Sequence, residues 1–307
     1  MIKYIHRNQL DVEKYNTCIS DAVNSRIYAY SWYLDIVCDS WNVLVKDDYE
    51  AVMPLPTRKK FGISYVYLPP WVQQLGVFSI NDIQESLVEE FLISIPKEFK
   101  FINVNMNSDV LLNCREVFNR DNYELKLNSP YKNLVKKYTK GRYSNILKAK
   151  KNGLTILTDF NLKKSISFFL KNTGENIHIN RLDNKKLDLL LVEAKTKDKL
   201  MSIAVSNEDY LLGVAIFLVD NKRITYLLSS INSKGREEYA MSYIIDNMIN
   251  RYANSNYILD FEGSQIKDIA FFFRSFGAEN KPYNELRIYR NSFFKLIFEV
   301  VKFIKKQ

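Results

Sequence analysis

The feature that most constrains the fold of this chain is a pattern that occurs twice. Residues 43–54 and 203–217 each hold two apolar runs separated by a short acidic segment, which is typical of a strand, a turn and a second strand. A helical spacing of apolar residues precedes both, at Ile27, Tyr30, Leu34 and Val37 in one case and Leu187, Leu190, Leu191 and Ala194 in the other. The repeated order of helix, strand and strand predicts a duplicated α/β fold.

A second parallel lies farther along each half, in the same order. A strand at 101–106, a helix at 110–118 and a strand at 123–127 are mirrored by a strand at 257–261, a helix at 266–276 and a strand at 285–289. The two parallels together favour duplication. We therefore expect a first domain at 1–130, a basic connecting helix at 131–155, a second domain at 156–290 and a C-terminal amphipathic helix at 291–307.

Composition narrows the classes of function. The chain of 307 residues has 44 Lys and Arg against 35 Asp and Glu, a net charge of +9, which favours a partner that carries phosphate or acidic lipid. Three widely spaced cysteines and two isolated histidines predict neither a disulfide framework nor a metal site. No uninterrupted apolar run is long enough to span a bilayer. We expect a cytoplasmic protein.

Two segments outside the repeats are basic. Residues 132–151 contain no acidic residue and carry a helical apolar stripe, made up of Leu134, Tyr138, Tyr143, Ile146 and Leu147. Lys140, Arg142 and Lys148 are candidates for anion binding there, and a solvated helix face is the equal alternative. Residues 292–306 form an apolar helix with scattered lysines, which either docks on the body of the protein or lies on the inner membrane as a peripheral contact.

The segment 257–278 has the pattern of a site at a strand end. Strand alternation places Asp260 and Glu262 on one face, where paired acids orient or deprotonate an amine. The alternative is that they pair with Lys or Arg as structural groups. Ser264 is expected to cap the helix that follows, and Gly277 lies where a left-handed stop residue belongs.

Two further groups of residues are candidates for ligand binding. A donor-rich turn before a helix predicts a seat for a phosphate or carboxylate, formed by Ser230, Asn232, Ser233, Lys234, Gly235 and Arg236. In the first half, cations, amides and an aromatic residue concentrate in loops at Arg58, Trp71, Gln73 and Gln74, where they are candidates for substrate binding. An ordinary strand-to-helix turn explains the first pattern equally well. Prolines that end strands explain the second equally well.

The order of these elements resembles the GNAT acyltransferase core, and its duplication resembles the Fem-type peptidyltransferases. The likeness rests on residues 140–154, on 259–264 together with 276–278, and on 30–34, 53–56 and 73–76. It implies two tandem GNAT-like domains in the α/β (α+β) class, each a mixed, mostly antiparallel sheet flanked by helices.

The resemblance also implies an activity. Fem-type and GNAT proteins transfer an acyl or aminoacyl group to an amine, without a metal and without a tightly bound cofactor. The cosubstrate is aminoacyl-tRNA in the Fem branch and acyl-CoA in ordinary GNAT proteins. The first domain is expected to hold the acceptor, with a cell-envelope precursor as one candidate.

Two departures from the family keep both donors open. The turn at 232–236 has one glycine where the GNAT pyrophosphate loop has a pair, and 161–200 is too short for the coiled-coil arm of some Fem proteins. The rival hypothesis is a catalytically degenerate tandem module that binds nucleic acid or anionic lipid through its basic helix. The sequence does not predict an oligomeric state.

Overall fold

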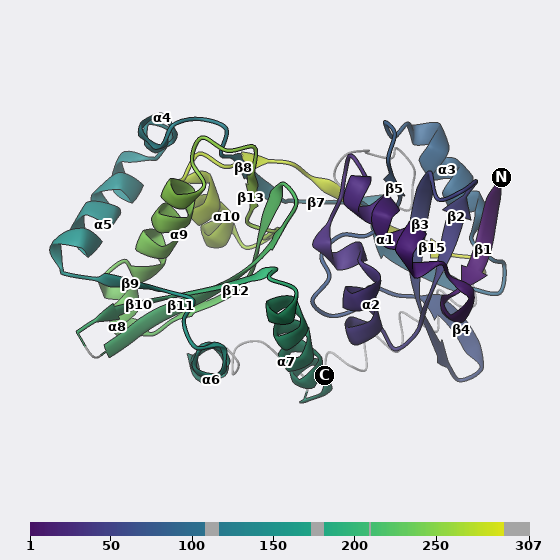
Figure 1. The fold of residues 1–307 in the computed structure, drawn as a ribbon, viewed down its shortest axis with the longest axis horizontal. Helices are drawn as coiled ribbons and strands as arrows, with labels where there is room; N and C mark the ends of the chain where they lie inside the picture. The colour runs from purple at the N-terminus through teal and green to yellow at the C-terminus, as the bar shows by residue number, and fades with distance from the viewer. Residues whose placement is uncertain (108–116, 173–180, 209, 292–307) are drawn as a thin grey trace. The chain divides into compact units, whose positions relative to one another are not determined.

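The computed structural model describes residues 1–107, 117–172, 181–208 and 210–291, and it divides the chain into two compact units. Unit 1 contains Met1–Arg120 and Pro282–Gln307, and unit 2 contains Asp121–Lys281. Each unit is built on its own sheet with helices packed against it (Figure 1). The predicted C-terminal helix at 292–307 and most of the predicted helix at 110–118 lie outside the described residues; Val117 and Phe118 belong to a strand.

Unit 1 holds the first sheet. Its strands are β1 (Ile2–His6), β2 (Trp41–Lys46), β3 (Ala51–Lys60), β4 (Ile63–Val66), β5 (Phe78–Ser79), β6 (Phe101–Asn105), β7 (Val117–Arg120) and β15 (Tyr283–Tyr289). Its helices are α1 (Val12–Asp21), α2 (Ser31–Val37) and α3 (Glu85–Ser94), with 3-10 turns at Arg7–Gln9 and Ile27–Ala29. The strand order is β1-β2-β3-β4-β6-β15-β7, and β5 pairs with β3.

Unit 2 holds the second sheet. Its strands are β8 (Tyr123–Lys126), β9 (Thr155–Thr158), β10 (Leu200–Asn207), β11 (Tyr210–Asp220), β12 (Arg223–Ile231), β13 (Ile258–Asp260) and β14 (Glu279–Asn280). Its helices are α4 (Tyr131–Val135), α5 (Lys140–Lys151), α6 (Leu162–Asn172), α7 (Arg181–Thr196), α8 (Ser233–Glu237), α9 (Ala240–Arg251) and α10 (Lys267–Arg274). The strand order is β14-β8-β13-β12-β11-β10-β9.

The two sheets are built in the same way. In each, two helices precede an antiparallel meander, which is β2-β3-β4 in unit 1 and β10-β11-β12 in unit 2. The last strand of each meander then pairs with a parallel strand, β4 with β6 and β12 with β13, and all other pairs among the described strands are antiparallel. This confirms the predicted fold class.

Each sheet contains one strand from the other half of the chain. β8, at the end of the first half, pairs with β13 and β14 in unit 2, whereas β15, at the end of the second half, pairs with β6 and β7 in unit 1. The division at Arg120 therefore differs from the expected domain boundary at 130, and residues 282–290 belong to unit 1. A strand's apolar pattern reports which face is buried and leaves its partner unspecified.

The core of unit 2 lies between its sheet and the helices α9 and α10, while α6 and α7 lie on the other face of the sheet (Figure 1). α9 presents an apolar stripe to this core: Met241, Ile244, Ile245 and Met248 are all buried. An apolar stripe wider than one row of side chains is what fixes an amphipathic helix to a sheet.

The segment 131–155 is part of unit 2, because α5 packs along α9. The buried carboxylate of Asp246 on α9 joins them: it accepts hydrogen bonds from the Tyr131 hydroxyl at 2.8 Å and the Tyr138 hydroxyl at 3.2 Å, and Lys150 Nζ lies 3.3 Å away. Burial is the main cause that raises the pKa of both phenols, so they remain donors at neutral pH.

Candidate active site

Two neighbouring strands diverge in the middle of the sheet of unit 2. β12 and β13 pair in parallel only from Arg223 to Thr225, after which β12 continues to Ile231 while β13 ends at Asp260. One edge of β12 is therefore unpaired beyond Thr225 among the described strands, although it lies inside a sheet. An unpaired strand edge offers a row of backbone donors and acceptors to an extended ligand.

The opening contains a β-bulge in β12. Ile216 pairs with Leu228 and Phe217 pairs with Tyr226, so Leu227 is an extra residue on β12. An extra residue lies outside the ladder, and bulges occur often beside active sites, where they redirect a side chain or a backbone group. The bulge begins one residue after the last parallel pair with β13, which places it at the mouth of the opening.

The wall behind the opening is aromatic. The ring of Phe261 stacks on Phe273 with centroids 4.9 Å apart, and the Tyr226 ring meets Phe261 edge-on at 6.3 Å. The Tyr226 hydroxyl contacts the Ser229 hydroxyl and lies 3.1 Å from the Met241 sulfur. Burial raises the pKa of Tyr226, so this phenol remains protonated at neutral pH and is not a base.

Asp260 is buried in an ion pair at the end of β13. Its Oδ2 lies 2.6 Å from the Arg223 guanidinium, which also contacts Glu124 Oε1 at 2.6 Å, so one cation joins β12, β13 and β8. Burial lowers the pKa of Arg223, but the carboxylates of Asp260 and Glu124 raise it by more, and the net direction is upward. Asp260 thus pairs with an arginine, which is the structural role that the sequence left open for it.

Glu262 does not share a strand face with Asp260, although strand alternation predicted that both acids lie on one face. β13 ends at Asp260, and Glu262 has a left-handed backbone with φ of 59°. Its N–H donates to Asp260 Oδ1 at 3.0 Å, and its side chain is partly exposed whereas that of Asp260 is buried. Glu262 is the more exposed acid of the predicted pair, and its catalytic role stays a prediction.

The helix after this strand begins later than expected. α10 starts at Lys267, and Ser264 makes a local turn with Ile266 rather than capping the helix. Ile266 and Ile269 are 61% and 40% exposed, whereas Ala270 and Phe273 are buried, so the buried face of α10 is narrow. Gly277 has φ of +84°, which confirms the predicted left-handed stop.

The predicted anion seat at 230–236 is closed by its own residues. Asn232 is the N-cap of the short α8, and its Oδ1 accepts the Gly235 N–H at 2.7 Å, while its Nδ2 donates to the Leu211 carbonyl at 2.9 Å. The Arg236 N–H is bonded to the Asn232 carbonyl. The side-chain oxygen of Asn232 thus accepts the N–H that an external anion would otherwise accept.

The remaining members of that turn are placed as follows. Ser230 is buried on β12, Ser233 begins α8, and Lys234 Nζ lies 3.7 Å from Glu238 and over the Tyr210 ring. The Arg236 guanidinium lies 3.5 Å from the Ile231 carbonyl.

Gly235 is the residue that lets this turn approach β11. A Cβ at this position would overlap the backbone carbonyl of Leu212. We expect Gly235→Ala to lower the free energy of unfolding by about 1–3 kcal/mol, the usual cost of overpacking. Gly141→Ala is the matched control: it lies in α5 with nothing within 4 Å of its added Cβ, and it should be neutral or slightly stabilising. Equal urea midpoints for the two variants would contradict the close approach.

Arg142, one of three predicted anion ligands, is buried in unit 2. Its Nε donates to Ser275 Oγ at 2.8 Å, its Nη1 contacts Ser242 Oγ, and its guanidinium lies 4.2 Å from the Phe272 ring centroid. Burial lowers the pKa of Arg142 to about 10. Arg142 fixes α5 to α9 and α10, whereas Lys140 and Lys148 are exposed and remain candidates for anion binding.

The predicted substrate residues of unit 1 lie in two places. Arg58 pairs with Asp39 and lies over the Tyr67 ring, 4.0 Å from its centroid. Trp71, Gln73 and Gln74 lie along the chain after β4: the Trp71 carbonyl accepts a hydrogen bond from Tyr33, and Gln74 Nε2 donates to Gln73 Oε1 at 2.8 Å.

In unit 1, residues 73–75 lie along the edge of β6, where β4 and β6 diverge, whereas the opening in unit 2 lies along the edge of β12. β4 and β6 also diverge after two parallel pairs, at Tyr65 and Val66. Here, however, the Leu75 N–H donates to the Asn105 carbonyl at 2.8 Å, and Asn105 Nδ2 donates to the Gln73 carbonyl at 2.7 Å. The free edge of β6 is thus occupied by the chain itself.

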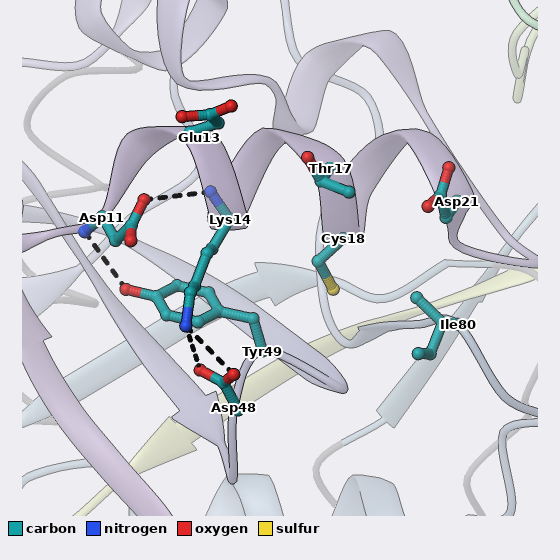
Figure 2. A pocket seen from close by; sticks show the side chains of 9 residues that line it. All are labelled: Asp11, Glu13, Lys14, Thr17, Cys18, Asp21, Asp48, Tyr49 and Ile80. Atoms are coloured by element: carbon teal, nitrogen blue, oxygen red, sulfur yellow. Dashed lines mark hydrogen bonds and ion pairs between the residues drawn. The ribbon is translucent and has the colours of Figure 1, made fainter.

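A pocket of about 460 Å³ lies on unit 1 between α1 and the β2–β3 turn (Figure 2). It is lined by Asp11, Glu13, Lys14, Thr17, Cys18, Asp21, Asp48, Tyr49 and Ile80. Lys14 Nζ pairs with Asp48 at 2.7 Å, and Asp11 caps α1 through the Lys14 N–H at 3.0 Å. Burial raises the pKa of the Cys18 thiol to about 12, so it is no nucleophile at neutral pH. The pocket contains none of the predicted site residues.

The described residues contain neither a metal-binding cluster nor a membrane-spanning helix. No group of three or more His, Cys, Asp or Glu side chains is placed to hold a metal ion in the described ranges. No helix among the described residues combines the length and the apolar character needed to cross a membrane.

Comparison with known proteins places this geometry in a fold family. No protein-family model matches the chain, and neither does any curated protein sequence. The crystal structure of FemX superposes with a TM-score of 0.67 over 96% of this chain and 99% of FemX, at 10% identity. The chain has a Fem-type, GNAT-like fold.

Two other structures share this fold. L-PGS from Bacillus licheniformis has a TM-score of 0.51 and 11% identity, with 97% of each chain covered. The C-terminal domain of a protein from Agrobacterium fabrum, described as a lysylphosphatidylglycerol synthetase, has a TM-score of 0.56 and 10% identity, with 92% of each chain covered. The Fem-type, GNAT-like fold thus extends over both units of this chain.

Sequence reasoning missed the residues that shape the opening. Arg223, Tyr226 and Leu227 are not among the candidate residues that the sequence predicts. A bulge changes no residue type, so nothing in the sequence marks Leu227. The signal available for Arg223 was a lone cation at the head of a buried strand that neighbours an acid-bearing strand.

Proposed function

We propose that the chain transfers an acyl or aminoacyl group to an amine at the opening between β12 and β13 in unit 2. The observation that carries this is the unpaired edge of β12 beside the bulge at Leu227, in a Fem-type, GNAT-like fold. Where β4 and β6 diverge in unit 1, residues 73–75 lie along the edge of β6, so we place the reaction site in unit 2.

The chemistry follows from the groups at the opening. The acyl donor lies extended along the edge of β12, with its carbonyl oxygen at the backbone N–H of the bulge, which stabilises the oxyanion. The amine nitrogen attacks the carbonyl carbon and forms the amide bond, and the bond from that carbon to the leaving oxygen or sulfur breaks. Glu262 accepts the proton that the amine loses and then gives it to the leaving oxygen or sulfur.

Aminoacyl-tRNA is the donor we infer. A CoA thioester needs a seat for its pyrophosphate, and the turn after β12 offers few free donors because Asn232 already accepts the Gly235 N–H. A net charge of +9 suits a polyanionic donor. By the same resemblance unit 1 is assigned to the amine acceptor, and a cell-envelope precursor is one candidate.

A transfer assay tests the reaction and the donor separately. Purified protein is incubated with isotope-labelled aminoacyl-tRNAs or acetyl-CoA and a panel of amines containing lysine, an alanyl peptide and an amino sugar, and amides are measured by mass spectrometry. We expect enzyme-dependent amide from aminoacyl-tRNA and none from acetyl-CoA. Product from acetyl-CoA alone would overturn the donor assignment. No product and no saturable binding of either donor would overturn the transferase assignment and favour a binding module.

A further inference from the structure

The outward side of α4 and α5, residues 131–151, is uniformly basic, and we call it the α4–α5 surface. All of its lysines are exposed: Lys132, Lys136, Lys137, Lys140, Lys148, Lys150 and Lys151. No acidic residue occurs in the sequence from 125 to 158. Lys150 pairs with Asp246 and Lys148 lies over the Tyr239 ring, while the other five have no ion-pair partner among the described residues.

Two apolar side chains stand among these lysines, contrary to the predicted stripe. Tyr143 and Leu147 are 46% and 48% exposed, one helical turn apart. Lys140 and Lys151 continue the same row, because residues at i, i+3, i+7 and i+11 share one face of a helix. The opposite face holds the buried residues of the helix, which are Arg142, Ile146 and Ala149.

We propose that the α4–α5 surface docks on an anionic lipid bilayer. A helix that shows leucine and tyrosine between lysines inserts the apolar groups at the headgroup level, while the lysine stems extend toward the lipid phosphates. A cluster of four to eight basic residues of this kind binds acidic lipid surfaces. In Figure 1, α5 lies at the outer edge of unit 2, beside α9.

The residue types favour lipid over RNA. Arginine is the residue that suits nucleic-acid recognition, because its planar guanidinium binds phosphate with two donors and stacks on bases. Every exposed cation of this surface is lysine, and its one arginine, Arg142, is buried against Phe272. An exposed leucine such as Leu147 gains nothing from a phosphate backbone but gains apolar burial at a bilayer.

Vesicle flotation of the full chain tests this docking. Vesicles of phosphatidylcholine with about 30% phosphatidylglycerol are compared with pure phosphatidylcholine at low and high salt. We expect binding to the anionic vesicles only, and its loss at high salt. Each lysine near the surface contributes about five-fold in partitioning, equivalent to about 1 kcal/mol. Lys140→Glu with Lys151→Glu should therefore lower binding by at least about 20-fold, and Tyr143→Ser with Leu147→Ser by about ten-fold.

Matched controls separate this surface from net charge and from other lipid contacts. Lys163→Glu with Lys164→Glu, on exposed positions of α6, changes the charge equally and should leave binding unchanged. All variants keep residues 292–307, so any contact made there is common to them. Equal binding by the α5 and α6 charge variants would overturn the proposal. So would a α5 variant that loses tRNA binding in a mobility-shift assay but keeps vesicle binding.

Discussion

Replacing Arg223 with methionine is expected to lower the free energy of unfolding by about 3–5 kcal/mol, because removing one partner of a buried ion pair leaves the other charges buried. Here two carboxylates, those of Asp260 and Glu124, would lose the cation that joins β12, β13 and β8. The side chain of Asp260 is 1% exposed, so water cannot replace the guanidinium without a local rearrangement. Urea unfolding followed by circular dichroism measures the loss.

The adjacent exposed Lys222 provides the control for Arg223. Lys222→Met changes the charge by the same amount one residue away and should cost less than about 1 kcal/mol, as expected of a surface charge. Adding Asp260→Leu to Arg223→Met should recover part of the loss, because one buried charge is removed with its partner. An Arg223→Met variant as stable as Lys222→Met would show that the ion pair does not hold the strands together.

Glu262→Gln is expected to lower the rate of amide formation by about 10²–10⁴-fold, the usual contribution of a general base. Glutamine has nearly the same shape and accepts no proton. The backbone contacts of this residue, its N–H to Asp260 and its carbonyl to the Tyr123 N–H at 3.2 Å, are independent of the side chain. Both backbone contacts should therefore survive the substitution, and urea unfolding of the variant checks its stability.

The exposed Asp268 in the first turn of α10 is the control for Glu262. Asp268→Asn removes a nearby carboxylate without touching the opening and should retain full activity. If Glu262→Gln retains full activity as well, the proton is taken by another group or by water, and Glu262 has no part in the chemistry. A loss of activity that tracks a loss of stability would assign Glu262 a structural role.

Much of the fold could be predicted because local patterns determined it. The two hairpins depend on the spacing of apolar residues, and the stop at Gly277 depends on one glycine. The exchange of β8 and β15 could not be predicted this way. Both strands have a buried side, and their partners are chosen by contacts more than 100 residues away in sequence, such as Leu125 with Leu259.

The candidate site was predicted in outline, and its details depend on tertiary contacts. Strand alternation put Asp260 and Glu262 together, but a strand end at Asp260 and a left-handed Glu262 gave them different surroundings. Basic composition grouped Arg142 with Lys140 and Lys148, although two phenylalanine rings and two serines bury Arg142. Residue type predicts charge, whereas burial decides whether that charge meets a ligand.

Photo-cross-linking tests most directly the central claim that the donor's acyl group lies between β12 and β13. An aminoacyl-tRNA charged with a benzophenone amino acid is irradiated with the full chain, and the modified peptides are identified by mass spectrometry. We expect modification within 226–231 and 261–265. This modification should disappear when excess unlabelled aminoacyl-tRNA competes. Competable modification confined to unit 1, with none at β12 or after β13, would contradict it.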